Sequence, residues 1–324
     1  MASEDSSSGW QLTESDPGVF SELLSTLGAK DLIVDDLYSL DADALSTLQP
    51  VHALIFLFKW VGNSDERGGG QGTFDDTFPG FFAHQVVNNA CATLAVLNAL
   101  LNIPGLTVGP EIEELRSFTL GMDPQSCGLT VTSSEFLRAA HNALSPPSAV
   151  SLDGLNIPQE KSEDAYHFVV YVPVGGSVYE LDGLKRSPVR HGSYSESGEG
   201  WISKAREVIE ARIATYPVGS LEFNLMAIHS DNLEKMRVEL QQAQSKNQEF
   251  AVSQLAIQIT QEEEKRRRWA FENSLRRHNH VGLVHALVLA LAKAGRLDSV
   301  TAQARTKMKE RIENNRKQRE LLED

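Results

Sequence analysis

The chain has 324 residues, of which 41% are hydrophobic, and it can therefore bury a sizeable core in one large domain or two ordinary ones. With 44 acidic and 30 basic residues, its formal net charge is −14, which argues against a nucleic-acid-binding protein. The longest apolar runs stay well below the roughly 18 residues of a membrane-spanning helix, and the polar, acidic start MASEDSSSGW is unlike a signal peptide. We therefore expect an intracellular protein without nucleic-acid or membrane partners.

The first part of the chain predicts a mixture of helices and strands. Asp16 and Pro17 are typical of a helix start, and the helix is expected to run to Leu27. Val51–Trp60 is short, apolar and aromatic, as in a buried strand, and the glycine-rich segment Asn63–Gly72 predicts a loop. The apolar run around Cys91 leaves little polar face, so we expect a central helix there.

The middle of the chain predicts two helices and a long loop. The helices are expected over Glu111–Leu120 and Ser133–Leu144, the second capped by Ser133, Ser134 or Thr132. The segment Ser145–Asp164 has three prolines and no hydrophobic periodicity. It is therefore predicted to be a long, mobile loop, and loops of this length inside a compact domain are often functional.

The next segments predict a β-hairpin, a last strand and a helical module. Gly175-Gly176 separates two strand-like runs, AYHFVVYVPV and SVYELDGLKRSPV, and Phe223–Asp231 predicts another strand. Prolines are absent from Asn232 onward, and Leu283–Gly295 is strongly apolar with a glycine at its end. We expect an α/β (α+β) domain over residues 1–231 and an all-α domain over residues 232–324, whose apolar helix must pack against something.

Cys91 is a candidate nucleophile. A thiol attacks as thiolate, and the first turn of a helix favours that negative charge, with Asn88 and Asn89 as candidate caps. His167 begins a strand directly after the long loop and is the candidate base. Asp182 lies on the partner strand of the predicted hairpin, where it is expected to orient the imidazole.

Gln85 is the candidate donor to the oxyanion that forms when a carbonyl is attacked. Its side-chain amide lies just ahead of the helix that carries Cys91. From these residues alone two interpretations stay open, because a free cysteine is often only a small buried side chain. Cys127 is expected to lie in a loop as an incidental thiol, and the absence of paired cysteine spacing predicts no metal and no cofactor.

Several blocks in order resemble the ubiquitin carboxyl-terminal hydrolase family of cysteine proteases. They are ESDPGVFSELL, PVHALIFLFKW, FFAHQVVNNACATLAVLNALLN, DAYHFVVYVPVGGSVYELDGLKRSPV and LEFNLMAIHSD. The resemblance implies a papain-like fold in which Cys91 is the nucleophile, His167 the base, Asp182 its orienting group and Gln85 the oxyanion stabiliser. It also implies that the loop Ser145–Asp164 crosses the active site as a size filter.

The C-terminal module resembles that of the proteasome-associated branch of this family, above all at RRHNHVGLVHALVLALAKAGRLDSV. The resemblance implies a deubiquitinase that acts on ubiquitin and its conjugates in the cytoplasm and the nucleus. It further implies that the C-terminal module binds the proteasomal ubiquitin receptor and, in animals, a chromatin-remodelling complex. The alternative function is a non-catalytic or autoinhibited ubiquitin-binding scaffold, and a general papain-like protease is a third possibility.

Three side chains are candidates for contact with the substrate. Leu221 and Phe223 alternate on one face of a strand, where an apolar pair is suited to docking the apolar patch of ubiquitin. An equally open alternative is that both belong to the core. Tyr38 stands where this branch commonly has a tryptophan, and we include it as a substrate-binding candidate.

Overall fold

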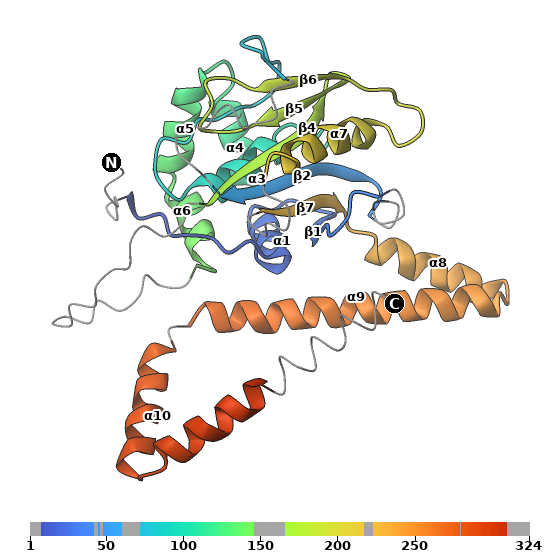
Figure 1. Cartoon of the computed structure of the whole chain (residues 1–324). Helices are drawn as coiled ribbons and strands as arrows, with labels where there is room; N and C mark the ends of the chain where they lie inside the picture. The colour runs from blue at the N-terminus through green and yellow to red at the C-terminus, as the bar shows by residue number, and fades with distance from the viewer. Residues whose placement is uncertain are drawn as a thin grey trace. The chain divides into compact units, whose positions relative to one another are not determined.

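The structure is a computed structural model that describes residues 8–41, 45, 48–59, 72–145, 166–216, 223–278 and 280–309 (Figure 1). Its strands are β1 (Leu32–Asp36), β2 (Val51–Lys59), β3 (Thr73–Phe74), β4 (Tyr166–Val174), β5 (Ser177–Leu181), β6 (Val189–Ser193) and β7 (Phe223–Ser230). Its labelled helices are α1 (Pro17–Thr26), α3 (Cys91–Leu100), α4 (Pro110–Phe118), α5 (Pro124–Ser133), α6 (Glu135–Asn142), α7 (Trp201–Ile213), α8 (Leu233–Ser245), α9 (Glu249–Arg276) and α10 (Val281–Lys293). Residues 297–309 form a further helix.

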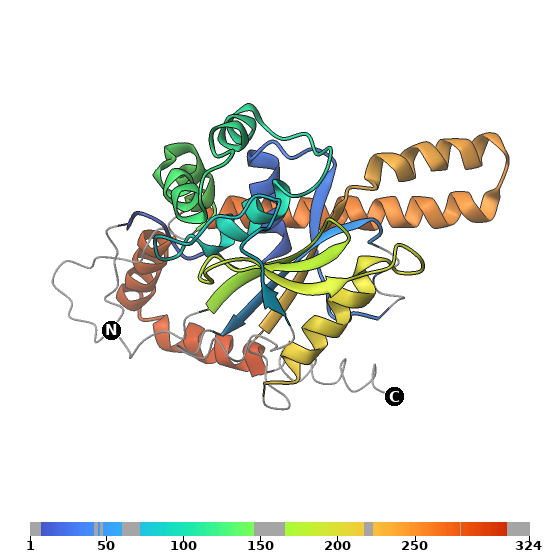
Figure 2. The same ribbon diagram turned by 90° about the horizontal axis from the view of Figure 1, so that it is seen from above.

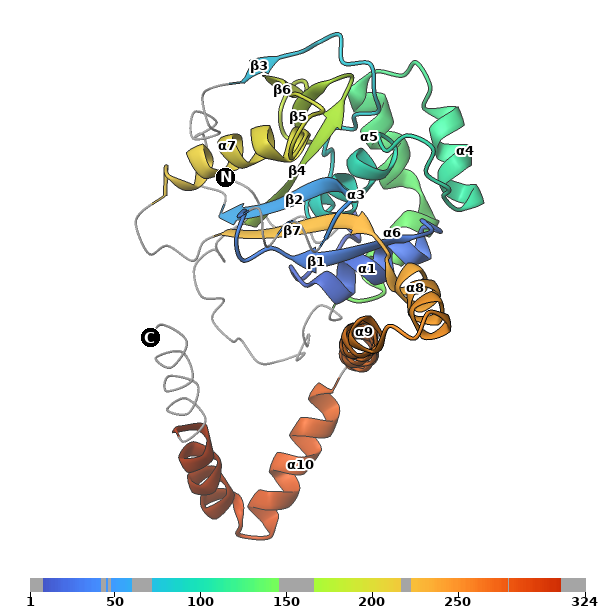
Figure 3. The same cartoon turned by 90° about the vertical axis from the view of Figure 1, so that its right-hand side faces the viewer.

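The strands form one sheet in the order β1-β7-β2-β4-β5-β6-β3, with every neighbouring pair antiparallel. Helix α7 covers one face, and α1 and α3 to α6 lie on the other (Figure 3). Alternate residues of β4 enter the two cores, since Phe168 and Val170 face α3 while Val169 and Tyr171 face α7. Burial on both faces explains why β2 and β4 are apolar almost throughout.

Two predicted helix caps are confirmed. The carboxylate of Asp16 accepts a hydrogen bond from the Val19 amide at 3.1 Å at the start of α1, and the hydroxyl of Ser134 accepts one from the Leu137 amide at 3.2 Å in α6. The loop predicted around Cys127 is wrong. Cys127 is buried within α5, whose N-cap is Asp123. Helix α5 packs against the segment that precedes Cys91, where Gly128 approaches His84.

The predicted hairpin is confirmed, with Gly175 and Gly176 at φ 54° and 75° in its two-residue turn. Both angles lie in the left-handed region that glycine tolerates best. The expected second strand is divided, because the chain turns after Leu181 and β6 begins only at Val189. The predicted loops lie outside the described residues, apart from Gly72 and Ser145.

Every described element after β7 is helical, so the expected α/β fold with a helical C-terminal region is confirmed. Helices α8 and α9 form an antiparallel hairpin (Figure 2). One compact unit continues through Arg277 and a second begins at His278. The domain boundary expected after Asp231 stays a prediction.

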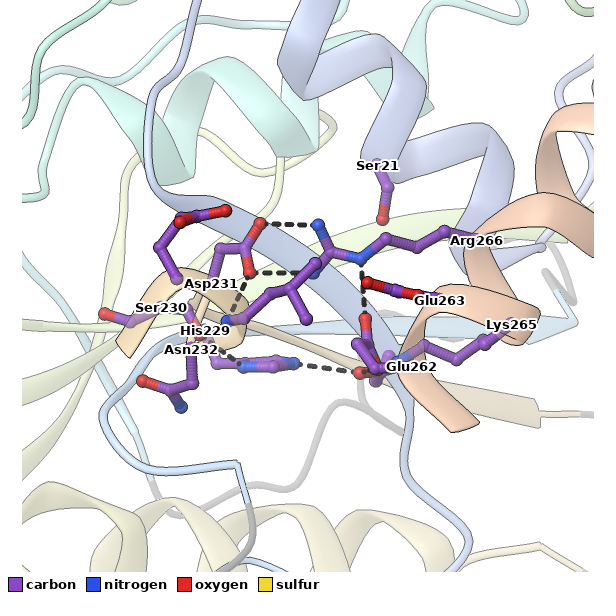
Figure 4. Close-up of polar contacts among 12 residues, drawn as sticks. Ser21, His229, Ser230, Asp231, Asn232, Glu262, Glu263, Lys265 and Arg266 are labelled. Carbon is purple, nitrogen blue, oxygen red and sulfur yellow. Dashed lines mark hydrogen bonds and ion pairs between the residues drawn. The ribbon is translucent and has the colours of Figure 1, made fainter. Parts of the chain in front are cut away.

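Ionic contacts hold α9 against the ends of β1 and β7 (Figure 4). The Arg266 guanidinium donates to both carboxylate oxygens of Asp231 at 2.7 and 2.8 Å, and the Lys265 ammonium donates to both oxygens of Asp35 at 2.8 Å. His229 also contacts Asp35 at 3.0 Å. These contacts explain why α9 belongs to the same compact unit as the sheet.

Helix α10 belongs to the second unit and has a large apolar surface. Its end is marked by Gly295, which follows the C-cap with a φ of 64°. Five apolar side chains of α10 are 43% to 60% exposed, namely Leu283, Val284, Leu287, Val288 and Leu289. The packing partner expected for this helix therefore stays a prediction. In the described part of the chain, no helix combines the length and the apolar character needed to cross a membrane.

Candidate active site

Cys91 is the first residue of α3 and is 8% exposed. The preceding Ala90 is the N-cap residue and offers no side-chain hydrogen bond, so the predicted capping by Asn88 or Asn89 is wrong. Asn89 has a φ of 67°, and its side-chain amide donates instead to the carbonyl of Trp10 at 3.1 Å. The first amides of α3 have no acceptor within the helix, and they favour negative charge at Cys91.

His167 is the second residue of β4 and is buried. Its Nε2–H donates to Oδ1 of Asp182 at 2.6 Å, and the ring also forms a hydrogen bond with the side chain of Cys91. Because Asp182 occupies Nε2, the nitrogen available to the sulfur is Nδ1. The structure therefore brings together the three side chains that the sequence predicted as a triad.

The electrostatics of this group favour a charged imidazole. Burial disfavours the positive ring, but the hydrogen bonds to Asp182 and Cys91 outweigh it and raise the pKa of His167 to about 9. At neutral pH the ring then holds its proton beside the sulfur. A cysteine sulfur beside an oriented, protonated imidazole, which favours the thiolate, is the arrangement of a cysteine hydrolase.

Asp182 directly follows β5, in a turn with two roles. Its Oδ1 accepts both the His167 ring and the Leu184 amide, the latter at 2.9 Å. The carbonyl of the next residue, Gly183, accepts the amide of Gln85 at 2.8 Å. A Cβ at Gly183 would lie 3.0 Å from that nitrogen, so the close approach favours glycine.

Gln85 lies ahead of α3 between this turn and α5. A Cβ at Gly128 of α5 would lie 2.1 Å from the carbonyl oxygen of His84, which shows how closely α5 supports the segment. The side-chain oxygen of Gln85 is buried and has no hydrogen-bond partner among the described residues. A buried carboxamide oxygen without a partner is uncommon in a protein interior, and a catalytic role is one explanation for it.

Of the predicted substrate-binding residues, the structure describes Tyr38 and Phe223. Phe223 lies two strands from His167 in the sheet, since both are paired with Phe58 of β2. Tyr38 follows β1 and is 94% exposed, and its hydroxyl donates to Asp36 at 3.4 Å. Phe223 is half-buried at the start of β7, between the rings of Phe56 and Tyr216 with centroids at 6.0 and 6.1 Å. Leu221 lies outside the described residues, so the predicted apolar pair is untested.

Sequence reasoning missed the buried charges around the candidate triad. Glu180 is two residues before Asp182 and is 1% exposed, and Lys185, three residues after it, is 7% exposed. A glutamate inside an otherwise apolar strand was the available signal, because a carboxylate is buried only with partners. Within the described ranges, no group of three or more potential metal-binding side chains is found.

Comparison with known proteins defines the class of this fold and site. Residues 10–214 match the model of the ubiquitin carboxyl-terminal hydrolases, family 1, and residues 252–297 match a second model described as ubiquitin carboxyl-terminal hydrolases. Ubiquitin carboxyl-terminal hydrolase ubh-4 of Caenorhabditis elegans is 38% identical over 312 residues, which cover 94% of each chain. Ubiquitin carboxyl-terminal hydrolase 2 of Schizosaccharomyces pombe is 39% identical over 293 residues, or 90% of this chain and 93% of the relative.

A solved structure gives the same assignment. The crystal structure of Trichinella spiralis UCH37 bound to ubiquitin vinyl methyl ester is similar with a TM-score of 0.64 and 35% identity, covering 81% of this chain and 99% of that one. The protein is a cysteine-type deubiquitinating enzyme with a mixed α/β catalytic fold. This chain belongs to the ubiquitin carboxyl-terminal hydrolase family, and the resemblance to the branch with a C-terminal extension is confirmed.

Proposed function

We propose that this enzyme cleaves the bond after the C-terminal glycine of ubiquitin with Cys91 as nucleophile. His167 holds and returns the proton, and Asp182 fixes the orientation of the ring. Gln85 and the backbone amide of Cys91 donate hydrogen bonds to the developing oxyanion. The observation that carries the proposal is the His167 ring, which joins Asp182 at 2.6 Å to the side chain of Cys91.

The reaction proceeds in two halves. The Cys91 sulfur attacks the carbonyl carbon of the terminal glycine, and the tetrahedral oxyanion collapses as the departing amine takes the proton from His167. Water then attacks the thioester and gives a proton to His167. Collapse of this second intermediate breaks the carbon–sulfur bond, and it releases ubiquitin with a free carboxylate and restores the enzyme.

The test is hydrolysis of a fluorogenic amide at the ubiquitin C-terminus by the wild type and by Cys91→Ala. We expect the variant to bind ubiquitin but to lose the activity. A ubiquitin vinyl methyl ester should label the wild type covalently and leave Cys91→Ala unlabelled. Retained hydrolysis in Cys91→Ala would overturn the role of Cys91, and a wild type that binds ubiquitin without reacting would favour the scaffold.

Ubiquitin binding by this chain is part of the proposal and is supported by the ubiquitin complex of the Trichinella spiralis protein. Tyr38 and Phe223 are proposed contacts, and the 94% exposure of Tyr38 leaves its ring available to a partner. Tyr38→Ala should raise KM for the ubiquitin amide and leave kcat unchanged, because this ring lies outside the reacting group. A fall in kcat at constant KM would remove Tyr38 from the binding surface.

We further propose that the C-terminal helical region binds the proteasomal ubiquitin receptor. The apolar side chains of α10, including Leu283 and Leu287 one turn apart, are exposed and available to a partner. Leu287→Glu should weaken binding of a receptor fragment in calorimetry and leave hydrolysis of the small amide unchanged. Equal affinity of wild type and variant would exclude this surface. A chromatin-remodelling partner and a cytoplasmic and nuclear location stay predictions.

A further inference from the structure

A buried carboxylate lies beside the turn that carries Asp182. Glu180 accepts hydrogen bonds from Lys185 Nζ at 2.9 Å, the Tyr171 hydroxyl at 3.1 Å and His191 Nε2 at 3.3 Å, and Arg212 Nη1 lies 3.1 Å from it. We call these five residues the Glu180 cluster. Burial disfavours the Glu180 carboxylate, but Arg212, His191 and Lys185 outweigh it and hold the pKa of Glu180 well below its usual range.

Two members of the Glu180 cluster flank the turn that contains Asp182. Glu180, on β5, precedes Asp182 by two residues, and Lys185 follows Asp182 by three. The Lys185 amide also donates to the Asp182 carbonyl at 2.9 Å, inside the loop that the Lys185–Glu180 ion pair completes. Because the Lys185–Glu180 ion pair joins the two ends of this short segment, the segment has little freedom to move the Asp182 carboxylate.

Arg212 of the Glu180 cluster contacts Phe58, a residue that packs against the candidate base His167. The Arg212 guanidinium, from α7, lies over the ring of Phe58 with its carbon 4.2 Å from the centroid. Phe58 is paired with His167 across β2 and β4, and their rings meet edge-on with centroids 5.7 Å apart. Arg212 therefore supports the packing of the imidazole while its charge is held by Glu180.

The same turn also positions the candidate oxyanion donor. Gly183, between Asp182 and Lys185, accepts the Gln85 amide through its carbonyl. A shift of the turn would displace the orienting carboxylate and the Gln85 segment together. A displacement of about 1 Å at such groups is enough to cost on the order of a hundredfold in rate.

We propose that the Glu180 cluster, through the Lys185–Glu180 ion pair and Arg212, positions Asp182, His167 and Gln85 for the reaction. Its members are positioning residues that contact neither the proposed nucleophile nor the scissile bond. The inference rests on the proposed function, since it assigns the cluster to the triad named there. The competing account is that the buried ions serve the core alone, where such groups are often replaceable by apolar side chains without loss.

The test is Lys185→Met in the full chain, which removes the ion pair and keeps most of the side-chain volume. Steady-state hydrolysis of the ubiquitin amide should show kcat reduced at least about tenfold with little change in KM, because positioning acts on the transition state. Lys185→Arg should recover most of the loss, since a guanidinium is again a cationic donor to Glu180. Lys204→Met is the matched control, because Lys204 pairs with the exposed Glu207 on α7.

A readout without substrate separates positioning from stability. The rate of Cys91 alkylation by iodoacetamide, followed by mass spectrometry against pH, reports the thiolate beside His167. If Lys185 holds Asp182 in place, the rise in alkylation should move to higher pH in Lys185→Met and stay unchanged in Lys204→Met. Lys185→Gln carries the same test if Lys185→Met does not fold.

The outcomes distinguish the two proposals. Unchanged kcat and an unchanged alkylation profile in folded Lys185→Met or Lys185→Gln would overturn the positioning role, whatever happens to stability. Activity that survives Cys91→Ala would instead overturn the proposed function. A loss of kcat together with the shifted profile, and recovery in Lys185→Arg, would establish the Glu180 cluster as part of the catalytic apparatus.

Discussion

The indole of Trp269 in α9 lies directly over Gly18 of α1. A Cβ at Gly18 would approach the Trp269 Cγ to 2.7 Å, and the Asn273 amide, one turn further along α9, donates to the Gly18 carbonyl at 3.0 Å. The Lys265 ammonium also lies over the Trp269 ring, with Nζ 4.9 Å from the indole centroid. The missing side chain at Gly18 is therefore what allows α9 to lie against α1.

Gly18→Ala should destabilise the protein. Alanine in a helix interior normally gains up to about 1 kcal/mol over glycine. Here the overlap with Trp269 should outweigh that gain and cost about 1–3 kcal/mol in the free energy of unfolding. Gly282→Ala in α10 is the matched control, because a Cβ there meets nothing within 4 Å, and it should leave stability unchanged or raise it. Urea unfolding measures the change in the free energy of unfolding for each variant. A Gly18→Ala variant more stable than the wild type would contradict the close contact with Trp269.

Arg266→Ala should weaken the attachment of α9 more at neutral pH than at acidic pH. Burial raises the pKa of Asp231, but its hydrogen bonds with Arg266 and with the Leu233 amide outweigh burial and lower that pKa below 3.8. A lowered pKa stabilises the folded state above the unfolded value, and this contribution is lost as the pH falls through the folded value. We expect a loss of about 1 kcal/mol at pH 7 and a smaller loss near pH 3.

The control for Arg266 is Arg237→Ala, whose guanidinium is exposed on α8 and pairs with Glu234 and Glu263. Urea unfolding at the two pH values should show little change for this variant. An equal loss for Arg266→Ala at both pH values would mean that the arginine acts through packing alone.

The folded state should lose stability between pH 6.5 and about 9, because the unfolded chain releases the His167 proton before the folded state does. Burial opposes the charged ring, but Asp182 and Cys91 raise the pKa of His167 from 6.5 to about 9. A raised pKa stabilises the folded state fully below the unfolded value, and the contribution is lost as the pH rises through the folded value. Asp182→Asn should make this decline shallower in urea unfolding. Asp298→Asn, at an exposed position, should reproduce the wild-type profile, and an equally steep decline in Asp182→Asn would refute the link.

A second histidine should make the fold sensitive to acid. His141 in α6 is buried, donates through Nε2 to the Gln11 carbonyl at 2.7 Å and accepts from the Thr93 hydroxyl at 2.8 Å, so it ties the N-terminal segment to α3. Burial lowers the pKa of His141 from 6.5 to about 4. The unfolded chain therefore takes up this proton first, and stability is lost as the pH falls from 6.5 towards 4.

His141→Asn tests this role in acid. It should reduce the free energy of unfolding at pH 7, where the Gln11 and Thr93 contacts are broken, and flatten the decline between pH 6.5 and 4. The difference between the two pH profiles is the measure, because carboxylates contribute equally to both. Parallel profiles for wild type and variant would exclude His141 as the acid-sensitive group.

The residues of the candidate site could be found in the sequence because each chemical role demands a particular side chain. A cysteine in the first turn of a helix, a hairpin with a two-glycine turn, a histidine on its first strand and an aspartate directly after its second were all visible in local patterns. The capping of α3 was not, because Asn89 is used by Trp10 from a distant part of the chain. Helix α5 was also missed, since Gly128 and Cys127 suggest a loop when the close approach of Gly128 to His84 is unknown.

The sequence by itself determined the family, the helical C-terminal region and the four side chains of the proposed reaction, because these depend on local spacing and residue type. Only the tertiary structure decided that Glu180 binds Lys185 and Arg212, and that α9 is held to the sheet by Asp35 and Asp231. A charged residue has the same local pattern whether water or another charge surrounds it. Its partner is chosen by which segments the fold brings within about 3 Å, and that choice is made across the whole chain.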